Sequence, residues 1–394
     1  MRNSTEKLNA LTSLRFFAAF MIILGHSSGI FFKLDFFGHF SVYQGVSFFF
    51  VLSGFILAYV YPQIEKGGVP KFFLARFARI WPAHIAALLL FFLLLFPSTE
   101  TSLTTALQKL ILFCNITMIH AWIPNAAFYF SFNSPSWSVS TEVFFYLLFP
   151  LLIFRLERTW FVKLIMTFII LLSMIIICNV THIPELSAVP SIHALIYINP
   201  LSHVFEFMLG ITMVLGYKKL KKLNISFFQA SFIETILLLL TLISLYFDYA
   251  LANSLQRYVG LAGKYWILYS GSCFCFGALF MVIALQKGVI SKWLNLRFFV
   301  LLGELSYALY LLHYIFRQYY INHYGLYNTQ YGGFLSTYHL FSYVAYWVLL
   351  LTSAYLMWRF IECPARTFIV KLPNRISKII LSKKSHKKET LVSE

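Results

Sequence analysis

Charged side chains are scarce in this chain, since only 11% of its 394 residues are Asp, Glu, Lys or Arg, whereas 60% are hydrophobic and 19% are aromatic. This composition lies far outside the usual range of soluble domains. The five cysteines lack zinc-ligand spacing, so we expect free buried thiols and no metal site. No internal repeat, low-complexity linker or cleavable signal is found, and the first apolar run is predicted to be a signal anchor. The chain is therefore predicted to be an integral membrane protein.

Ten apolar segments are long enough to cross about 30 Å of hydrocarbon. They are residues 10–32, 43–62, 79–97, 136–154, 160–178, 198–216, 231–249, 265–286, 297–316 and 338–360. Residues 107–124 form a weaker candidate, because a central Cys114-Asn115 pair favours a re-entrant or interfacial helix. We expect an all-α, polytopic fold with one transmembrane domain over residues 1–366 and a basic cytoplasmic tail over 367–394.

The distribution of basic residues supports ten spans with both termini in the cytoplasm. With this topology, the cytoplasmic segments hold 25 of the 31 Lys and Arg residues and the outer loops hold five. The formal net charge of +17 is then explained by orientation and by contact with anionic lipid headgroups of the bilayer. Nucleic acid binding is not implied.

Two ionisable side chains, Arg15 and His26, lie within the first apolar segment, and each needs a reason to be there. Eleven positions make about three helical turns, so both side chains project from one face, about 16 Å apart along the axis. Arginine keeps its proton and requires water, a counter-ion or an anionic ligand, whereas a neutral imidazole can act as a base or nucleophile. The pair predicts a functional site that crosses the membrane.

A second pair of arginines, Arg76 and Arg79, lies at the cytoplasmic entry of the third segment. Their three-residue spacing places them on one helix face, and guanidinium forks suit phosphate oxygens better than a lysine does. A phosphate-bearing donor on the cytosolic side would fit this pair. The alternative is ordinary positive-inside anchoring of the helix.

Glu142 enters the fourth segment from the outer side, about a turn and a half below the interface. Ser138 and Tyr146 lie four residues to either side of it and share its helix face, and Pro135 is suitably placed to start the helix. A carboxylate at this depth can orient a histidine or accept a proton from a sugar hydroxyl. The alternative is pairing with Arg or His purely for helix assembly.

Two later motifs place polar side chains on helix faces at three-residue spacing, pairing His203 with Glu206 and Tyr310 with His313. Buried polar side chains of this kind commonly hydrogen-bond neighbouring helices. We therefore consider a supporting role in the bundle beside a direct role in catalysis.

Seven ordered signatures between residues 10 and 366 carry a resemblance to a known family, the bacterial acyltransferase-3 membrane proteins. They are Leu14-Arg15 followed by His26, the Gly-rich and Phe-rich run 45–55, Arg76 with Arg79, the run Pro135 to Glu142 that includes Trp137, Phe205-Glu206-Phe207 with Gly210, the run Gly303 to His313, and the run Phe360 to Arg366. His203 stands where many relatives have a basic Arg, and Thr141 replaces a common Val or Leu.

The resemblance implies a bacterial, multi-pass enzyme of the cell membrane that O-acylates surface sugars and related acceptors. Acyl-CoA, with acetyl as the commoner group, would bind with its phosphates near Arg76 and Arg79 and its thioester past Arg15. His26 would receive the acyl group or deprotonate the acceptor hydroxyl, and Glu142 would hold the imidazole in the useful tautomer. Trp137, Ser138, Tyr146, Glu206, Tyr310 and His313 would contact the substrate or support the site.

Two other classes of protein also carry buried charges: a transporter or flippase, and a membrane binding protein without chemistry. Transporter folds commonly show repeats and broken helices in matching positions, and the two halves of this chain share no such pattern. A binding protein would not need Arg15 and His26 on one face together with an arginine pair at the donor side. An acyltransferase is the preferred interpretation.

Overall fold

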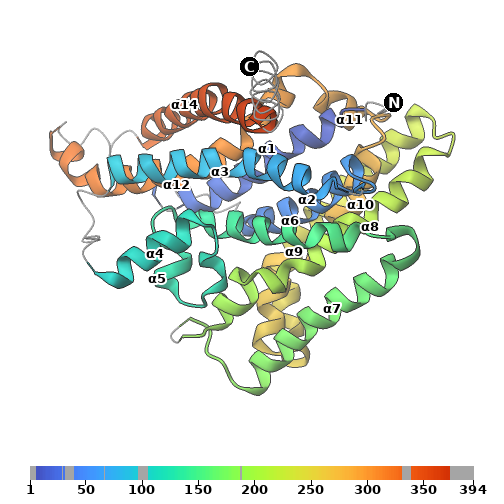
Figure 1. Cartoon of the computed structure of the whole chain (residues 1–394), viewed down its shortest axis with the longest axis horizontal. Coiled ribbons are helices and arrows are strands. Elements are labelled where there is room, and N and C mark those ends of the chain that lie inside the picture. Colours follow the sequence, from blue (N-terminus) through green and yellow to red (C-terminus); the bar gives the residue numbers. More distant parts are fainter. Residues whose placement is uncertain are drawn as a thin grey trace, which may run out of the picture.

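The computed structural model describes residues 6–28, 30–31, 40–65, 67–95, 105–186, 189–330 and 339–372. These residues form helices and turns, with no strand among them (Figure 1). The α-helices are α1 Asn9–Ser27, α2 Gly45–Val60, α3 Val69–Leu94, α4 Ala106–Ile116, α5 Ala126–Tyr129, α6 Trp137–Ile153, α7 Leu156–Val180, α8 Val204–Lys221, α9 Phe227–Ser270, α10 Cys273–Ile283, α11 Val289–Leu294, α12 Arg297–Gln330 and α14 His339–Met357. The all-α prediction is confirmed.

Nine runs of described residues are long and apolar enough to cross a membrane, whereas the sequence predicts ten. The difference lies in one run of 57 residues, Phe227–Ile283, which contains the predicted span 231–249 and all but the last three residues of the predicted span 265–286. Within α9, Gly260 breaks the helical geometry with φ 72°. The Asn179 side chain donates to the Val259 carbonyl at 2.8 Å and accepts from the Ala262 amide at 3.0 Å, which satisfies backbone groups on both sides of this break.

The weaker candidate at 107–124 contains α4, whose 11 residues extend about 16 Å and are too short to cross the hydrocarbon core. A single 3₁₀ turn, His120–Trp122, follows it. In Figure 1, α4 and α5 lie together at one side of the molecule. All five cysteines are free, as expected. Residues 373–394 of the predicted basic tail lie outside the described residues, so the tail stays a prediction.

Glycines allow the central helices to approach backbone to backbone. A Cβ at Gly210 of α8 would lie 1.9 Å from the Val51 carbonyl oxygen of α2, and a Cβ at Gly54 would lie 2.1 Å from the Phe207 carbonyl oxygen. A Cβ at Gly303 of α12 would lie 2.0 Å from the Thr12 carbonyl oxygen of α1. Small residues at such contacts are how helices pack closely where the solvent is lipid. These contacts fix α2 against α8 and α1 against α12.

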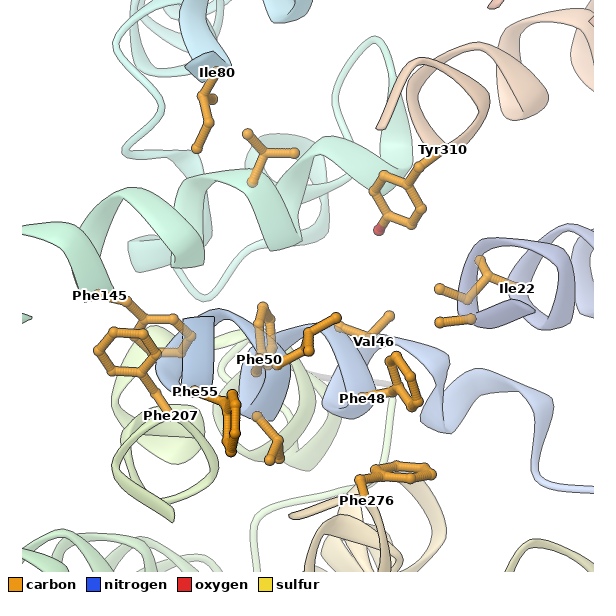
Figure 2. Close-up of a cluster of buried hydrophobic side chains, with 14 of the residues drawn as sticks. Ile22, Val46, Phe48, Phe50, Phe55, Ile80, Phe145, Phe207, Phe276 and Tyr310 are labelled. Atoms are coloured by element: carbon orange, nitrogen blue, oxygen red, sulfur yellow. The ribbon is translucent and has the colours of Figure 1, made fainter. Parts of the chain in front are cut away.

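Aromatic side chains fill the space around α2. Phe145 of α6 stacks on Phe207 of α8 with ring centroids 4.6 Å apart, and Phe48 meets Phe280 edge to face at 4.7 Å. Figure 2 shows Phe145 and Phe207 together near one end of α2, Phe276 facing Phe48 of α2, and Tyr310 on α12. Such offset and edge contacts add to the area that the rings bury. The packed layer holds α1, α2, α6 and α12 around the polar site described next.

Candidate functional site

A cavity of about 160 Å³ lies among α1, α2, α3, α6 and α12. Its walls are partly aliphatic and aromatic, and charged or hydroxyl-bearing side chains converge on it from all five helices. The polar lining residues are Thr12, Arg15, Ser53, Arg76, Arg79, Ser138, Glu142, Tyr146, Ser306, Tyr307 and Tyr310. Seven side chains predicted from the sequence as site residues thus line one cavity. They are Arg15, Arg76, Arg79, Ser138, Glu142, Tyr146 and Tyr310.

Three guanidinium groups and one carboxylate line the cavity, which leaves an excess of two positive charges. Arg76 lies over the rings of Tyr61, Phe72 and Tyr146, with centroids 5.5, 6.0 and 5.8 Å away. Arg15 and Arg79 make no hydrogen bond to any described residue. Guanidinium donors without partners in a low-dielectric cavity favour an anionic ligand.

Glu142 is held from two helices. Its Oε1 accepts hydrogen bonds from the Tyr146 hydroxyl at 2.7 Å and from the Ser53 hydroxyl of α2 at 3.1 Å. Among the described residues, Glu142 makes no contact with His26. The prediction that Glu142 orients the His26 ring is therefore not supported by the geometry. The reason is the geometry of α1: Glu142 lines the same cavity as Arg15, and His26 lies three turns further along that helix.

Tyr310 and Ser138 form the end of the cavity that faces the histidines. Their hydroxyl oxygens are 2.7 Å apart, and the Tyr310 hydroxyl also donates to the Pro135 carbonyl at 2.9 Å. Both side chains are nearly buried, with 6% and 7% of their surface exposed. One turn beyond, His313 Nδ1 lies 2.6 Å from the Tyr310 carbonyl oxygen.

His26 and His313 form a close pair. His26 Nδ1 lies 2.9 Å from His313 Nε2, and the two ring planes are within 15° of parallel with centroids 5.1 Å apart. His313 is fully buried, whereas His26 is partly exposed and meets the rings of Tyr43 and Tyr314 edge to face. The expected pairing of Tyr310 with His313 is present, and it extends to His26 on another helix.

Trp137 and Glu206 lie behind the cavity wall and do not line it. His203 Nδ1 contacts Glu206 Oε1 at 2.9 Å, as the spacing predicts, and both side chains are buried. Trp137 packs on the Tyr197 ring at 4.8 Å, and the cavity residue Phe50 packs on His203 at 4.8 Å. These residues support the cavity from outside.

Two residues of the site were not singled out from the sequence. The Ser53 hydroxyl donates to Glu142, and the Arg317 Nε donates to the His26 carbonyl oxygen at 2.6 Å. The only available signal for Ser53 is its place in the run 45–55. Within the part of the chain that the structure describes, no cluster of three or more His, Cys, Asp or Glu side chains has the geometry to hold a metal ion.

The family model described as an acyltransferase domain, acyltransferase-3, matches residues 8–359 of this chain. The chain belongs to the acyltransferase-3 family. Its nine long apolar runs among the described residues agree with a multi-pass membrane protein of this family. The resemblance drawn from the seven signatures is thereby confirmed.

Two curated relatives of this chain are similar over part of their length. Acyltransferase MdmB of Streptomyces mycarofaciens is 34% identical over 163 residues, which cover 39% of this chain and 40% of the relative. Protein 2 in picA locus of Rhizobium radiobacter is 40% identical over 90 residues, which cover 22% of this chain and 44% of the relative. The matches therefore span less than half of either relative. No solved structure matches the chain.

Proposed function

We propose that this protein is a membrane O-acyltransferase that moves an acyl group, most simply acetyl, from cytosolic acyl-CoA to a hydroxyl of an extracytoplasmic or lipid-linked carbohydrate. The observation that carries the proposal is the cavity lined by three arginines, whose Tyr310 end adjoins the His26–His313 pair. A cavity suited to an anionic donor, around Arg15, is thus followed along α1 by a histidine suited to nucleophilic or base chemistry, His26.

On the donor side, Arg76 and Arg79 would bind the phosphates of acyl-CoA. Arg79 has free donors, and Arg76 is held in place by the aromatic rings around it. Arg15 lies deeper along α1 and lines the same cavity. It would contact the donor between its phosphates and its thioester, where a guanidinium stabilises the negative charge that develops on the thioester oxygen.

On the other side, His26 would act on the thioester or on the acceptor. As a nucleophile, its ring nitrogen attacks the thioester carbon, the carbon–sulfur bond breaks, CoA leaves as the thiolate, and the acceptor hydroxyl then takes the acyl group from the imidazole. As a general base, it takes the proton of the hydroxyl while the hydroxyl oxygen attacks the thioester carbon, the carbon–sulfur bond breaks, and CoA leaves as the thiolate, which receives that proton from the imidazolium. The first route allows donor and acceptor to remain on opposite sides of the membrane.

The acceptor would approach the partly exposed face of His26. Tyr43 is 37% exposed and meets the His26 ring at 5.6 Å. Tyr43 also lies 6.5 Å from the Tyr269 ring, so aromatic faces extend away from His26. Aromatic rings of this kind stack on the apolar faces of sugars. This arrangement supports a carbohydrate acceptor.

The test is acyl transfer from radiolabelled acetyl-CoA in purified protein reconstituted into vesicles, with wild type compared with His26→Ala. We expect CoA release by wild type in the presence of a sugar acceptor and none by His26→Ala. Label retained on denatured wild type but absent from His26→Ala supports the acyl-histidine route, and CoA release without retained label supports the base route. Absence of thioester turnover with every acceptor would refute the proposal and favour a transporter or flippase.

A further inference from the structure

The hydrogen-bond partners of the ring nitrogens in the His26–His313 pair restrict which nitrogen of each ring carries the proton. The Tyr310 carbonyl oxygen can only accept a hydrogen bond, so His313 Nδ1, at 2.6 Å, carries a proton. His313 is completely buried and contacts no carboxylate among the described residues, a setting that favours the neutral ring. A neutral imidazole has one N–H, which leaves Nε2 of His313 as an acceptor.

The same logic continues to His26. His313 Nε2 accepts a hydrogen bond, and the atom 2.9 Å from it is His26 Nδ1. His26 Nδ1 therefore carries the proton of that ring, and Nε2 of His26 carries the lone pair. Nε2 lies on the side of the ring away from His313, and the His26 side chain as a whole is partly exposed.

We propose that His313 is the positioning residue of this enzyme, which fixes His26 in the Nδ1–H tautomer through a relay from the Tyr310 carbonyl to His313 and then to His26. This inference rests on the proposed function, in which Nε2 of His26 attacks the thioester or takes the acceptor proton. The relay assigns to a second histidine the role that carboxylates usually have toward catalytic histidines.

The groups around the pair are consistent with a neutral relay. The Arg317 Nε donates to the His26 backbone carbonyl at 2.6 Å, so a permanent cation lies beside the residue whose ring the relay keeps neutral. Tyr43 and Tyr314 face the His26 ring, and the Tyr346 hydroxyl donates to the His313 backbone carbonyl at 3.1 Å. These are the titratable neighbours of the pair from the elements packed against it, together with Tyr310.

During transfer the relay does more than hold the ring. When Nε2 of His26 gains an acyl group or a proton, the ring becomes cationic, and the Nδ1–H bond to His313 strengthens. The proton on Nδ1 can remain there or move to His313 Nε2, and in either case it returns when the ring is neutral again. No atom is gained or lost by His313 over the cycle.

The experiment compares His313→Ala and His313→Gln with wild type and uses Tyr346→Phe as the control. Gln offers a side-chain oxygen that can accept from His26 Nδ1, whereas Ala offers none. Tyr346→Phe removes a hydrogen bond to the His313 backbone and leaves the ring relay intact. Each variant is reconstituted, and kcat and the KM for acetyl-CoA are measured. The tautomer of His26 is read from ¹⁵N-histidine NMR spectra, with its signals assigned by comparison with His26→Ala.

We expect His313→Ala to lower kcat by about 100-fold or more with the donor KM within about twofold, because loss of a correctly protonated base has effects of this size. His313→Gln should recover about tenfold or more of that loss, and Tyr346→Phe should stay near wild type. The spectrum should show protonated Nδ1 on His26 in wild type and a shift toward protonated Nε2 in His313→Ala.

Either of two results would overturn the inference: an unchanged kcat in folded His313→Ala, or a wild-type spectrum with the proton of His26 on Nε2. Equal losses in His313→Ala and His313→Gln would also count against it, because a merely structural histidine gives that result. If wild type turns over no thioester, the proposed function fails, and the spectrum alone then decides whether His313 sets the tautomer.

Discussion

Replacing Arg79 by alanine should weaken donor binding without disturbing the fold. Arg79 lines the cavity and makes no hydrogen bond to any described residue, so no hydrogen bond within the described part of the protein is lost when it is removed. Arg76 is a poorer target, because its guanidinium packs over Tyr61, Phe72 and Tyr146 and its removal would also disturb those rings. The effect of Arg79→Ala should therefore report on the ligand.

The size of the effect follows from the interaction that is lost. A hydrogen bond to a charged group contributes about 1.5–3 kcal/mol. At about 1.4 kcal/mol per factor of ten, its loss raises the donor KM by about 10- to 150-fold. Arg79→Lys should give a smaller increase, because a lysine keeps the charge and loses the two-pronged geometry.

The assay is initial-rate CoA release over a range of acetyl-CoA concentrations, repeated with S-acetylpantetheine, which has the thioester but no phosphate. Arg79→Ala should raise the KM for acetyl-CoA and leave that for S-acetylpantetheine nearly unchanged. Arg257→Ala is the matched control, because Arg257 packs on its neighbour Tyr258 at 4.6 Å and does not line the cavity. Higher salt should reduce the difference between wild type and Arg79→Ala.

Two results would refute the reasoning about Arg79. The first is an acetyl-CoA KM within about twofold of wild type in a folded variant, which would mean that no donor phosphate reaches this guanidinium. The second is an equal loss with acetyl-CoA and with S-acetylpantetheine, which would mean that Arg79 acts on the cavity or the thioester and not on phosphate. An equal loss in Arg257→Ala would point to a general effect of net charge.

Three further substitutions test the packing and the buried polar groups. Gly210→Ala places a methyl group against the Val51 carbonyl, so the helices must separate, and we expect unfolding in detergent at a lower temperature by several degrees. His203→Ala leaves the buried Glu206 without its partner and should cost about 3–5 kcal/mol, read from thermal unfolding, while activity per folded molecule changes little. Tyr310→Phe removes a hydroxyl that bonds a serine and a proline carbonyl, and should cost about 1–3 kcal/mol and lower kcat.

Each of these three expectations has a clear contrary result. An unfolding temperature for Gly210→Ala equal to that of wild type would mean that the close contact between α2 and α8 does not exist in the membrane. A His203→Ala protein as stable as wild type would mean that the fold does not depend on the contact between His203 and Glu206. Wild-type kcat and stability in Tyr310→Phe would mean that the Tyr310 hydroxyl contributes neither to the fold nor to catalysis.

Much of the fold follows from the sequence, because lipid imposes a simple rule on it. Every stretch of about twenty apolar residues must become a helix that satisfies its own backbone groups. Each of the ten predicted segments accordingly overlaps helices over most of its described residues. The break at Gly260 within the run 227–283 could not be predicted from the sequence. Its backbone groups are satisfied by the side chain of Asn179 on α7, which is far away in the chain.

The candidate site was predictable within one helix and less so between helices. Spacing of three or four residues correctly placed Glu142 beside Tyr146, and His203 beside Glu206. Contacts between helices depend on rotation and depth, which one sequence does not fix. For this reason the partner of His26 was expected to be Glu142, whereas the structure places His313 there. Ser53 was missed for the same reason, since its contact with Glu142 exists only after α2 and α6 have packed.

The dependence of the histidine relay on helix register can be argued further. His313 lies ten residues, or about 15 Å, beyond Gly303, where α12 touches the Thr12 carbonyl of α1. A slip of one residue between these helices turns a side chain by about 100° and shifts it by about 1.5 Å, which is enough to separate His313 from His26. Only glycine permits the close contact at position 303, because any Cβ there would lie 2.0 Å from that oxygen. The tautomer of His26 therefore depends on the backbone contact between Gly303 and Thr12, near the other end of the pair formed by α1 and α12. Arg15, which is proposed to contact the donor, lies on α1 one turn from this contact.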